Sequence, residues 1–116
     1  MLQLFYNTMK EVGLMAIVEV AIIPMGIGST SVSQYVADCH KVLENDKRIK
    51  LVLTPMGSVL EGDLDLVLAA IRKMHEVPFD NGALRVSTTI RIDDRRDKSA
   101  SIEQKLKSVQ EKMTQP

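Results

Sequence analysis

The sequence is poor in three features, and each scarcity argues against a class of protein. It has one cysteine in 116 residues, so an internal disulfide bond is impossible, which fits a reducing compartment. Its formal net charge is zero, with 15 basic and 15 acidic side chains, so the long-range positive field of a general nucleic-acid-binding protein is missing. Aromatic residues make up only 3% of the chain. Because RNA-recognition domains stack bases on aromatic side chains of their central strands, this class is disfavoured too.

Long apolar runs are also missing. The most apolar stretch, residues 15–28, contains Glu19 and Pro24 and is too short to span a bilayer. The first residues lack the basic, apolar and small-residue segments of a secretory signal. The remaining composition, 45% hydrophobic and 26% charged, is that of an ordinary globular domain. We therefore expect one soluble domain located in the cytoplasm.

Residues 1–14 form an extension ahead of a sharp strand signal that opens at Met15. One interpretation is a short helix or arm whose apolar face consists of Leu4, Phe5, Met9 and Val12. The other is that Met15 is the natural start, because residues 10–12 can be encoded by a run resembling a bacterial ribosome-binding site. We divide the chain into this extension, a central domain over residues 15–98 and a C-terminal amphipathic helix within residues 99–116.

From Met15 onward the pattern predicts strand, helix, strand, strand, helix, strand and a final helix. Segments rich in Val and Ile predict strands over residues 16–23, 48–54, 58–61 and 84–92. Apolar residues at three- and four-residue spacing predict the helices. The first begins with a capping box formed by Ser31 and Gln34 and runs to about Glu44. The second is capped by Asp63 and has its last turn disrupted by Pro78, and the third is capped by Ser101.

This order predicts an α+β fold, the ferredoxin-like βαββαβ sandwich, with an added C-terminal helix. Two helices then cover one face of a four-stranded sheet. The first strand is apolar on both sides, with Val18, Val20 and Ile22 on one and Ile17, Ala21 and Ile23 on the other. A strand that is apolar on both sides needs cover on both sides. The terminal helix or a second subunit can supply it, and we expect a homo-oligomer packed through the sheet face.

Several motifs permit both a structural and a functional interpretation. The turn from Gly26 to Ser31 precedes a helix, where free N–H groups favour an anion, but it also reads as a tight turn with a cap. His40 and His75 have no second ligand at metal-binding spacing, so structural or surface roles are favoured. Cys39 falls on an apolar helix stripe with no general base beside it, which indicates a small core residue.

The segment 93–98 mixes three aspartates with three basic residues. Its first interpretation is an ion-pair loop, either solvated or between subunits. Asp93, Asp94 and Asp97 also suit a divalent cation, but the interleaved Arg95 and Arg96 would compete with it.

Polar residues at strand positions are the most informative set. They are Glu19, Thr54, Glu61, Thr88, Thr89 and Arg91. Alternation places Glu19, Thr89 and Arg91 on the helix-free face, and Glu61 is a candidate to join them. If that face is buried in an oligomer, these groups must be paired or bind a ligand. They therefore form either an interfacial hydrogen-bond network or a site for a cationic or amino-bearing ligand.

Five blocks of the sequence, taken together and in order, resemble a family of small thiamine-binding proteins. They are residues 18–36 (VEVAIIPMGIGSTSVSQYV), 53–57 (LTPMG), 60–65 (LEGDLD), 75–76 (HE) and 88–98 (TTIRIDDRRDK). The resemblance runs from about Met15 to Val109. It implies a ferredoxin-like fold assembled into homodimers or homotetramers, no catalytic activity, and thiamine (vitamin B1) or its hydroxymethylpyrimidine half as ligand. The N-terminal extension and Pro78 depart from the family pattern.

Carried over by position, the resemblance points to the Gly26–Ser31 loop, the segment from Thr54 to Gly57, Glu61 and the pair Thr88 and Thr89 as the ligand neighbourhood, which partly coincides with the polar strand set. With Glu19 from that set, the candidate ligand-binding residues are Glu19, Gly28, Ser29, Ser31, Thr54, Met56, Gly57, Glu61, Thr88 and Thr89. The hydroxyls of Ser29, Ser31 and Thr54 would bond the aminopyrimidine edge, and Met56 would pack on the ring. Glu19 or Glu61 would accept from the exocyclic amine or balance the thiazolium charge.

Three hypotheses follow from different classes of protein. The first is a thiamine or pyrimidine carrier or sensor, with the ligand near the sheet face at a subunit interface. The second is a structural or regulatory homo-oligomer without a small-molecule ligand. The third, an enzyme acting on a thiamine precursor, ranks last because the sequence shows no nucleophile–base pair, metal set or phosphate loop.

Overall fold

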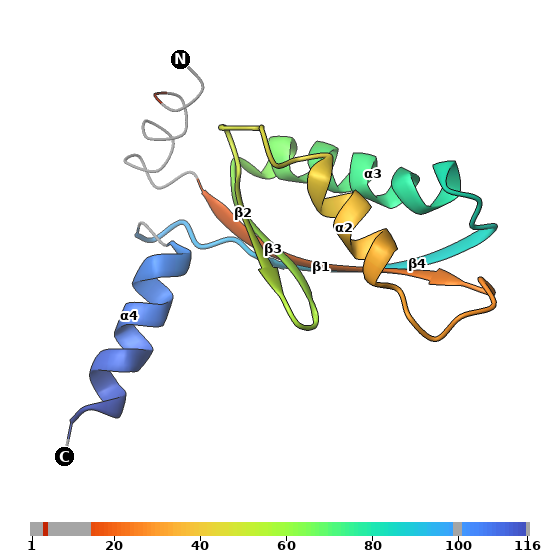
Figure 1. Cartoon of the computed structure of the whole chain (residues 1–116). Coiled ribbons are helices and arrows are strands. Elements are labelled where there is room, and N and C mark those ends of the chain that lie inside the picture. Colours follow the sequence, from red (N-terminus) through yellow and green to blue (C-terminus); the bar gives the residue numbers. More distant parts are fainter. Residues whose placement is uncertain (1–3, 5–14, 99–100, 116) are drawn as a thin grey trace.

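The computed structural model describes residue 4, residues 15–98 and residues 101–115. Apart from Leu4, the extension and its two interpretations lie outside the described residues. The elements follow the predicted order (Figure 1): β1 (Ala16–Met25), α2 (Ser33–Lys41), β2 (Lys50–Thr54), β3 (Gly57–Gly62), α3 (Leu64–Asp80), β4 (Arg85–Asp93) and α4 (Ile102–Met113). The predicted ferredoxin-like α+β class is confirmed.

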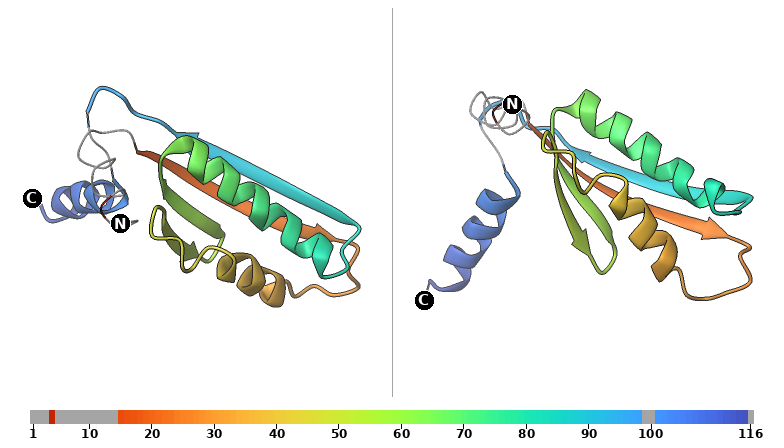
Figure 2. Two further views of the ribbon diagram at one scale, coloured as in Figure 1. Left: turned by 90° about the horizontal axis from the view of Figure 1, so that it is seen from above. Right: turned by 45° about the horizontal axis from the view of Figure 1, so that its top comes forward.

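The four strands form one antiparallel sheet in the order β2-β3-β1-β4. Helices α2 and α3 lie side by side on one face of this sheet, as both views of Figure 2 show. Between sheet and helices, Val18, Leu60 and Val67 are completely buried. Val18 and Leu60 are also cross-strand partners. Burying side chains of this size stabilises the fold by roughly 1.5–3 kcal/mol each, so this layer is the core of the domain.

The opposite face of the sheet is not covered by α4. This helix lies beyond the end of the sheet where β1 begins (Figures 1 and 2), linked to the strands by the ion pairs Lys50–Glu103 and Lys105–Asp93. On the open face, Ile23 remains 46% exposed. The sequence analysis expected either the terminal helix or a second subunit to pack on this face. In the single chain α4 does not pack there, and packing of a second subunit stays a prediction.

Pro78 does not disrupt the last turn of α3, contrary to the sequence prediction, because the helix continues through it to Asp80. A proline has no N–H to donate, so the carbonyl of Met74, four residues earlier, loses its helical partner. In the structure the thiol of Cys39 donates to this carbonyl, with Sγ 3.4 Å from the oxygen. A contact from α2 thus compensates for the missing bond, which local sequence patterns cannot anticipate.

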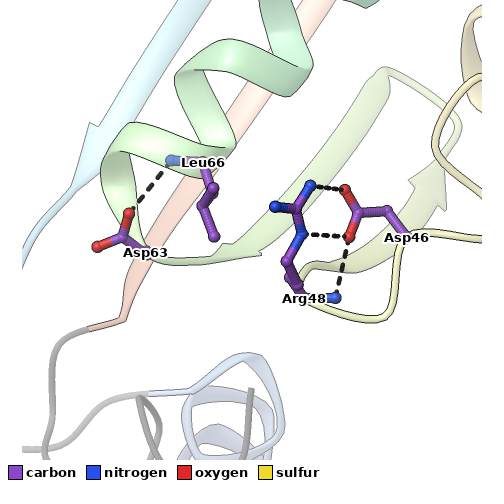
Figure 3. Close-up of polar contacts among 4 residues, drawn as sticks. All are labelled: Asp46, Arg48, Asp63 and Leu66. Atoms are coloured by element: carbon purple, nitrogen blue, oxygen red, sulfur yellow. Dashed lines mark hydrogen bonds and ion pairs between the residues drawn. The ribbon is translucent and has the colours of Figure 1, made fainter. Parts of the chain in front are cut away.

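The predicted start and end of α2 are both wrong. Val32 occupies the N-cap position without a side-chain hydrogen bond, and the helix ends at Lys41 rather than near Glu44. The capping box fails because the Ser31 hydroxyl lies 3.4 Å from that of Ser33 instead of bonding the helix backbone. The predicted caps of the other two helices are confirmed. Asp63 accepts from Leu66 N (Figure 3), and Ser101 accepts from Gln104 N.

A chelated ion pair explains why β2 begins at Lys50 and not at Arg48. The guanidinium of Arg48 donates through Nε and Nη2 to both carboxylate oxygens of Asp46, at 3.1 and 3.0 Å (Figure 3). The Arg48 backbone N–H also donates to Asp46, at 3.0 Å. This backbone group is consequently used in a turn and not in the strand ladder.

This pair makes folding stability depend on pH. The side-chain hydrogen bonds from Arg48 lower the pKa of Asp46 below its ordinary value, outweighing the effect of partial burial. A lowered folded-state pKa contributes stability that is present above the unfolded pKa of about 3.9 and lost as pH falls through the folded value. We expect Asp46→Asn to be less stable than the wild type at pH 7, with the difference vanishing in strong acid. Urea unfolding of both proteins from pH 7 down to about pH 2 tests this, and a constant difference would contradict it.

Candidate ligand-binding site

A pocket of about 120 Å³ lies where α2 and the β2–β3 hairpin meet the second half of β1. Its wall is mostly apolar and includes Val20, Ile22, Val32, Val36 and Met74. An apolar cavity of about 150 Å³ in another protein takes up benzene. At about 120 Å³ the pocket is somewhat smaller than that cavity, and its volume is of the order of one six-membered ring.

The backbone of β1 gives this pocket a polar edge. Strand β3 pairs with β1 only from Ala16 to Val20, whereas β4 pairs with it as far as Met25. Along residues 21–23, which line the pocket, no strand in the described part of the chain pairs with the β3-side edge. Backbone N–H and C=O groups on that edge are strong hydrogen-bonding groups. They offer a ring both donors and acceptors.

Two hydroxyl groups of the hairpin add to this edge. Thr54 Oγ1 donates to the carbonyl of Gly57, at 2.9 Å, and accepts from the backbone N–H of Met56, at 3.3 Å. Since a hydroxyl has two acceptor sites, one remains available to a ligand. Ser58 also lines the pocket and is 6% exposed.

Cys39 of α2 forms another part of the pocket wall, and its thiol is a poor nucleophile at neutral pH. Burial, with a smaller contribution from the charge of Asp38, raises the pKa of Cys39 from 9.0 to about 11. The thiolate is the nucleophilic form of cysteine, and very little of it exists at neutral pH. Cys39 therefore acts as a small neutral residue, as the sequence predicted, although its place in a pocket wall was not foreseen.

Gly57 holds the hairpin close to β1. A Cβ atom at this position would lie 2.5 Å from the carbonyl oxygen of Val20, and the backbone φ is +156°. Only glycine permits this approach without displacing a strand.

We expect Gly57→Ala to lower the free energy of unfolding by about 1–3 kcal/mol, because the added methyl group forces β3 away from β1. Met56→Ala is the matched control, since Met56 is 84% exposed and its truncation should change stability by less than about 0.5 kcal/mol. Urea denaturation measures both. Equal stability of the two variants would show that the close approach to Val20 has no energetic consequence.

The predicted ligand residues do not all converge on one place. Thr54, Met56 and Gly57 line the pocket. Gly28, Ser29 and Ser31 lie in the exposed loop that leads into Val32, a lining residue. This loop is internally bonded, with Ser29 Oγ accepting from Ser31 N at 3.1 Å.

Four other predicted residues lie away from the pocket. Glu19 and Thr89 are exposed on the open face of the sheet. Glu61 is completely buried near the far end of β3, where its register partners are Ile17 and Lys50. The hydroxyl of Thr88 lies 2.7 Å from Nδ1 of His75 and is bonded to it.

Sequence reasoning missed Ser58, Val36 and Met74, which also line the pocket. One signal was available for Ser58. It shares the helix-facing side of β3 with Leu60, so it is a polar residue at a position where alternation calls for an apolar one. The backbone edge of β1 carries no residue-type signal, because any sequence presents the same N–H and C=O groups.

The acidic and basic segment after β4 forms ion pairs within the chain. Arg96 bonds Asp94, and Arg95 bonds Asp97 through two nitrogens, at 2.5 and 2.9 Å. The bond from Arg95 lowers the pKa of Asp97 to about 2. The ion-pair interpretation is confirmed, and in residues 15–98 and 101–115 no three His, Cys, Asp or Glu side chains are grouped as a metal ion would require.

The fold defines the class of protein, a small ferredoxin-like α+β domain. Across the ranges that the structure describes, no helix has the length and apolar character needed to cross a membrane. The chain belongs to the thiamine-binding protein family, whose model matches residues 18–110.

Relatives and solved structures agree with this assignment. The chain is 51% identical over 98 residues to the UPF0045 protein YqgV of Bacillus subtilis, covering 82% of this chain and 94% of the relative. The crystal structure of hypothetical protein MJ1052 from Methanocaldococcus jannaschii is similar with a TM-score of 0.74 and 40% identity, over 84% of this chain and 98% of the other. A candidate thiamine biosynthesis/salvage protein from Thermotoga maritima shares the fold, with a TM-score of 0.68 and 14% identity over 82% of this chain and 98% of the other.

Proposed function

We propose that this protein binds thiamine or its hydroxymethylpyrimidine moiety and does not catalyse a reaction. The observation that carries the proposal is the ring-sized pocket beside the β3-side edge of β1, lined by the β2–β3 hairpin. Membership of the thiamine-binding family supports it. So does the name of the Thermotoga maritima protein with the same fold, which refers to thiamine biosynthesis or salvage.

The aminopyrimidine ring matches the pocket in size and in polarity. It is a flat six-membered ring, and the volume of about 120 Å³ suits one ring of that kind. Its amino group donates hydrogen bonds and its ring nitrogens accept them. The backbone edge of residues 21–23 supplies both complements, and Thr54 Oγ1 has an acceptor site left for the amino group.

The thiazolium ring of thiamine then lies outside the pocket, because the volume does not accommodate a second ring. Met56 is placed at this rim and is 84% exposed. Its flexible thioether is suited to cover an aromatic cation. The positive charge stays close to water and is not buried, which avoids a large desolvation cost.

A binding role without catalysis fits the chemistry of the wall. Cys39 is the one titratable side chain among the described residues that line the pocket, and its raised pKa keeps it protonated at neutral pH. General acid–base and nucleophilic catalysis both need a group with a pKa near the working pH or an activating neighbour. The groups in the wall recognise a ring but are not tuned to react with it.

A second candidate function is that of a structural or regulatory homo-oligomer, a homodimer or homotetramer packed through the sheet face. The exposure of Ile23 and Met25 on the open face, at 46% and 40%, favours it. On the same face Glu19, Thr89 and Arg91 are also exposed and would be the polar part of such an interface. Assembly is compatible with ligand binding.

We also propose that the protein is located in the cytoplasm. This proposal rests on the single cysteine, because a chain with one cysteine forms no internal disulfide bond and suits a reducing compartment.

Calorimetric titration of the ligand-free protein tests the function, with native mass spectrometry on the same sample. The titrants are thiamine, hydroxymethylpyrimidine and the hydroxyethylthiazole half of thiamine. We expect thiamine and the pyrimidine to bind in the micromolar range, about −8 kcal/mol, and the thiazole not to bind. Tight binding of the thiazole alone would reject the proposed orientation. No heat and no bound mass at millimolar thiamine would reject the ligand and leave the homo-oligomer.

A further inference from the structure

A second groove, of about 450 Å³, lies between the segment that follows β4 and one face of α4. Arg95 and Lys98 line it from the segment, and Lys105, Ser108 and Lys112 line it from the helix. The three helix residues are spaced three and four positions apart, so they share one face of α4. An ion pair between Lys105 Nζ and Asp93 Oδ2, at 2.7 Å, joins the helix to the end of β4.

All the charged side chains that line this groove are cationic. They are Arg95, Lys98, Lys105 and Lys112. Two aspartates outside the lining compensate part of this charge, because Arg95 bonds Asp97 and Lys105 pairs with Asp93. Among the residues that the structure describes, Lys98 and Lys112 have no acidic partner. The groove therefore keeps an excess of two positive charges, and a groove lined by one sign of charge concentrates ions of the other sign.

The two paired cations retain hydrogen-bond donors as well. A guanidinium has five N–H donors, and Arg95 uses Nε and Nη2 for Asp97, which leaves Nη1 available. An ammonium group has three donors, of which Lys105 gives one to Asp93. Ser108 adds a hydroxyl to the same wall. Charge-assisted bonds from arginine and lysine are the usual means of recognising phosphate oxygens.

We propose that this groove binds the diphosphate group of a phosphorylated small molecule, such as a nucleoside diphosphate. The excess of positive charge matches an anion with two or more negative charges. Cations line both walls, so two linked phosphates can contact the segment and the helix together. Sites for small organic molecules have volumes of roughly 300–1,000 Å³, so the groove has room for an organic group too. Val109, which is 57% exposed, offers that group an apolar surface.

The groove is independent of the ring-sized pocket. The two share no lining residue. Residues 21–23 of β1 line the pocket, whereas Asp93, beside the groove, is the register partner of Ile17 at the other end of that strand. A failure of thiamine binding would therefore leave the diphosphate site standing, and the reverse holds as well.

Calorimetric titration with inorganic diphosphate and with adenosine diphosphate, in the absence of divalent cations, tests this site. At about 20 mM salt, where screening is weak, we expect each to bind at one site per chain with a Kd below about 1 mM. The double variant Lys98→Gln/Lys112→Gln should bind both at least about tenfold more weakly, because two charge-assisted contacts are lost. Since neither lysine has an acidic partner in the described chain, the variant should fold, which far-ultraviolet circular dichroism checks.

The double variant Lys47→Gln/Lys107→Gln is the matched control, because it removes the same charge elsewhere. Neither lysine lines the groove, and Lys107 lies on another face of α4, where it pairs with Glu111. We expect wild-type affinity for both anions. Equal weakening in the two double variants, a folded Lys98→Gln/Lys112→Gln protein with wild-type affinity, or no heat from millimolar diphosphate would overturn the site. Binding of inorganic diphosphate without adenosine diphosphate would overturn its assignment to an ester.

Discussion

Thiamine binding is expected to become undetectable at about 1 mM ligand when Val36 is replaced by phenylalanine. Val36 lines the pocket from α2, and the pocket has the volume of about one ring. The phenyl group would occupy the space that we assign to the aminopyrimidine. Filling a cavity with an apolar side chain adds contacts to the core, so the variant should be at least as stable as the wild type. Calorimetry and thermal unfolding on the same preparation measure both properties.

Val42→Phe is the matched control for this experiment. Val42 follows α2 directly, is 46% exposed and does not line the pocket, so the same substitution there should leave thiamine binding unchanged. If Val36→Phe is folded and still binds thiamine with wild-type affinity, the ligand binds elsewhere. The exposed polar residues of the open sheet face would then be the next region to test.

The thiol of Cys39 is expected to react with a disulfide reagent at pH 8 at least about 100 times more slowly in the folded protein than in the unfolded one. Its pKa of about 11, against an ordinary value of 9.0 for a free thiol, reduces the thiolate fraction by this factor, and burial restricts access further. Cys39 is the only cysteine, so the absorbance change reports on this residue alone. Labelling in denaturant gives the unfolded rate, and equal rates would contradict the burial of the thiol.

The same residue reports on the ligand and on alkaline stability. Because Cys39 lines the pocket, saturating thiamine should slow its labelling further, and unchanged labelling despite measurable binding would place the ligand outside the pocket.

The raised pKa of Cys39 also makes stability depend on pH in the alkaline range. A folded-state pKa raised above the unfolded value contributes stability that is present below about pH 9 and lost as pH rises toward about 11. The wild type should therefore lose more stability over this range than Cys39→Ala.

Much of the architecture is predictable because its signals are local. Runs of Val and Ile with turn residues between them gave the right order of strands and helices, and Asp63 caps α3 as expected. Some predictions failed because of contacts within a few residues: the Ser31 hydroxyl lies beside that of Ser33 instead of capping α2, and Asp46 bonds Arg48 ahead of β2. Another failed at a place where a distant segment makes a contact. The expected break at Pro78 is absent, and Cys39, from another helix, bonds the carbonyl that the proline leaves free.

The candidate site was predictable only in part. Resemblance to the thiamine-binding family indicated the segment from Thr54 to Gly57, and this hairpin does line the pocket. The same resemblance indicated Glu61 and Thr88, which the fold places elsewhere: Glu61 is completely buried on β3, and Thr88 bonds His75. A match to a family motif indicates residues by their position in the sequence. It does not show which of these residues lie close together in the folded chain.

The sequence by itself determined the class of this protein, because alternation, helical spacing and turn residues act over a few neighbours and suffice for a ferredoxin-like α+β domain. It also identified the family. Only the tertiary structure decided where a ring can bind and where a basic groove forms. The first depends on how far β3 pairs with β1, which it leaves after Val20, and the second on the packing of α4 beside the segment that follows β4. Both contacts join residues that are not neighbours in the chain, so they are set by packing in three dimensions.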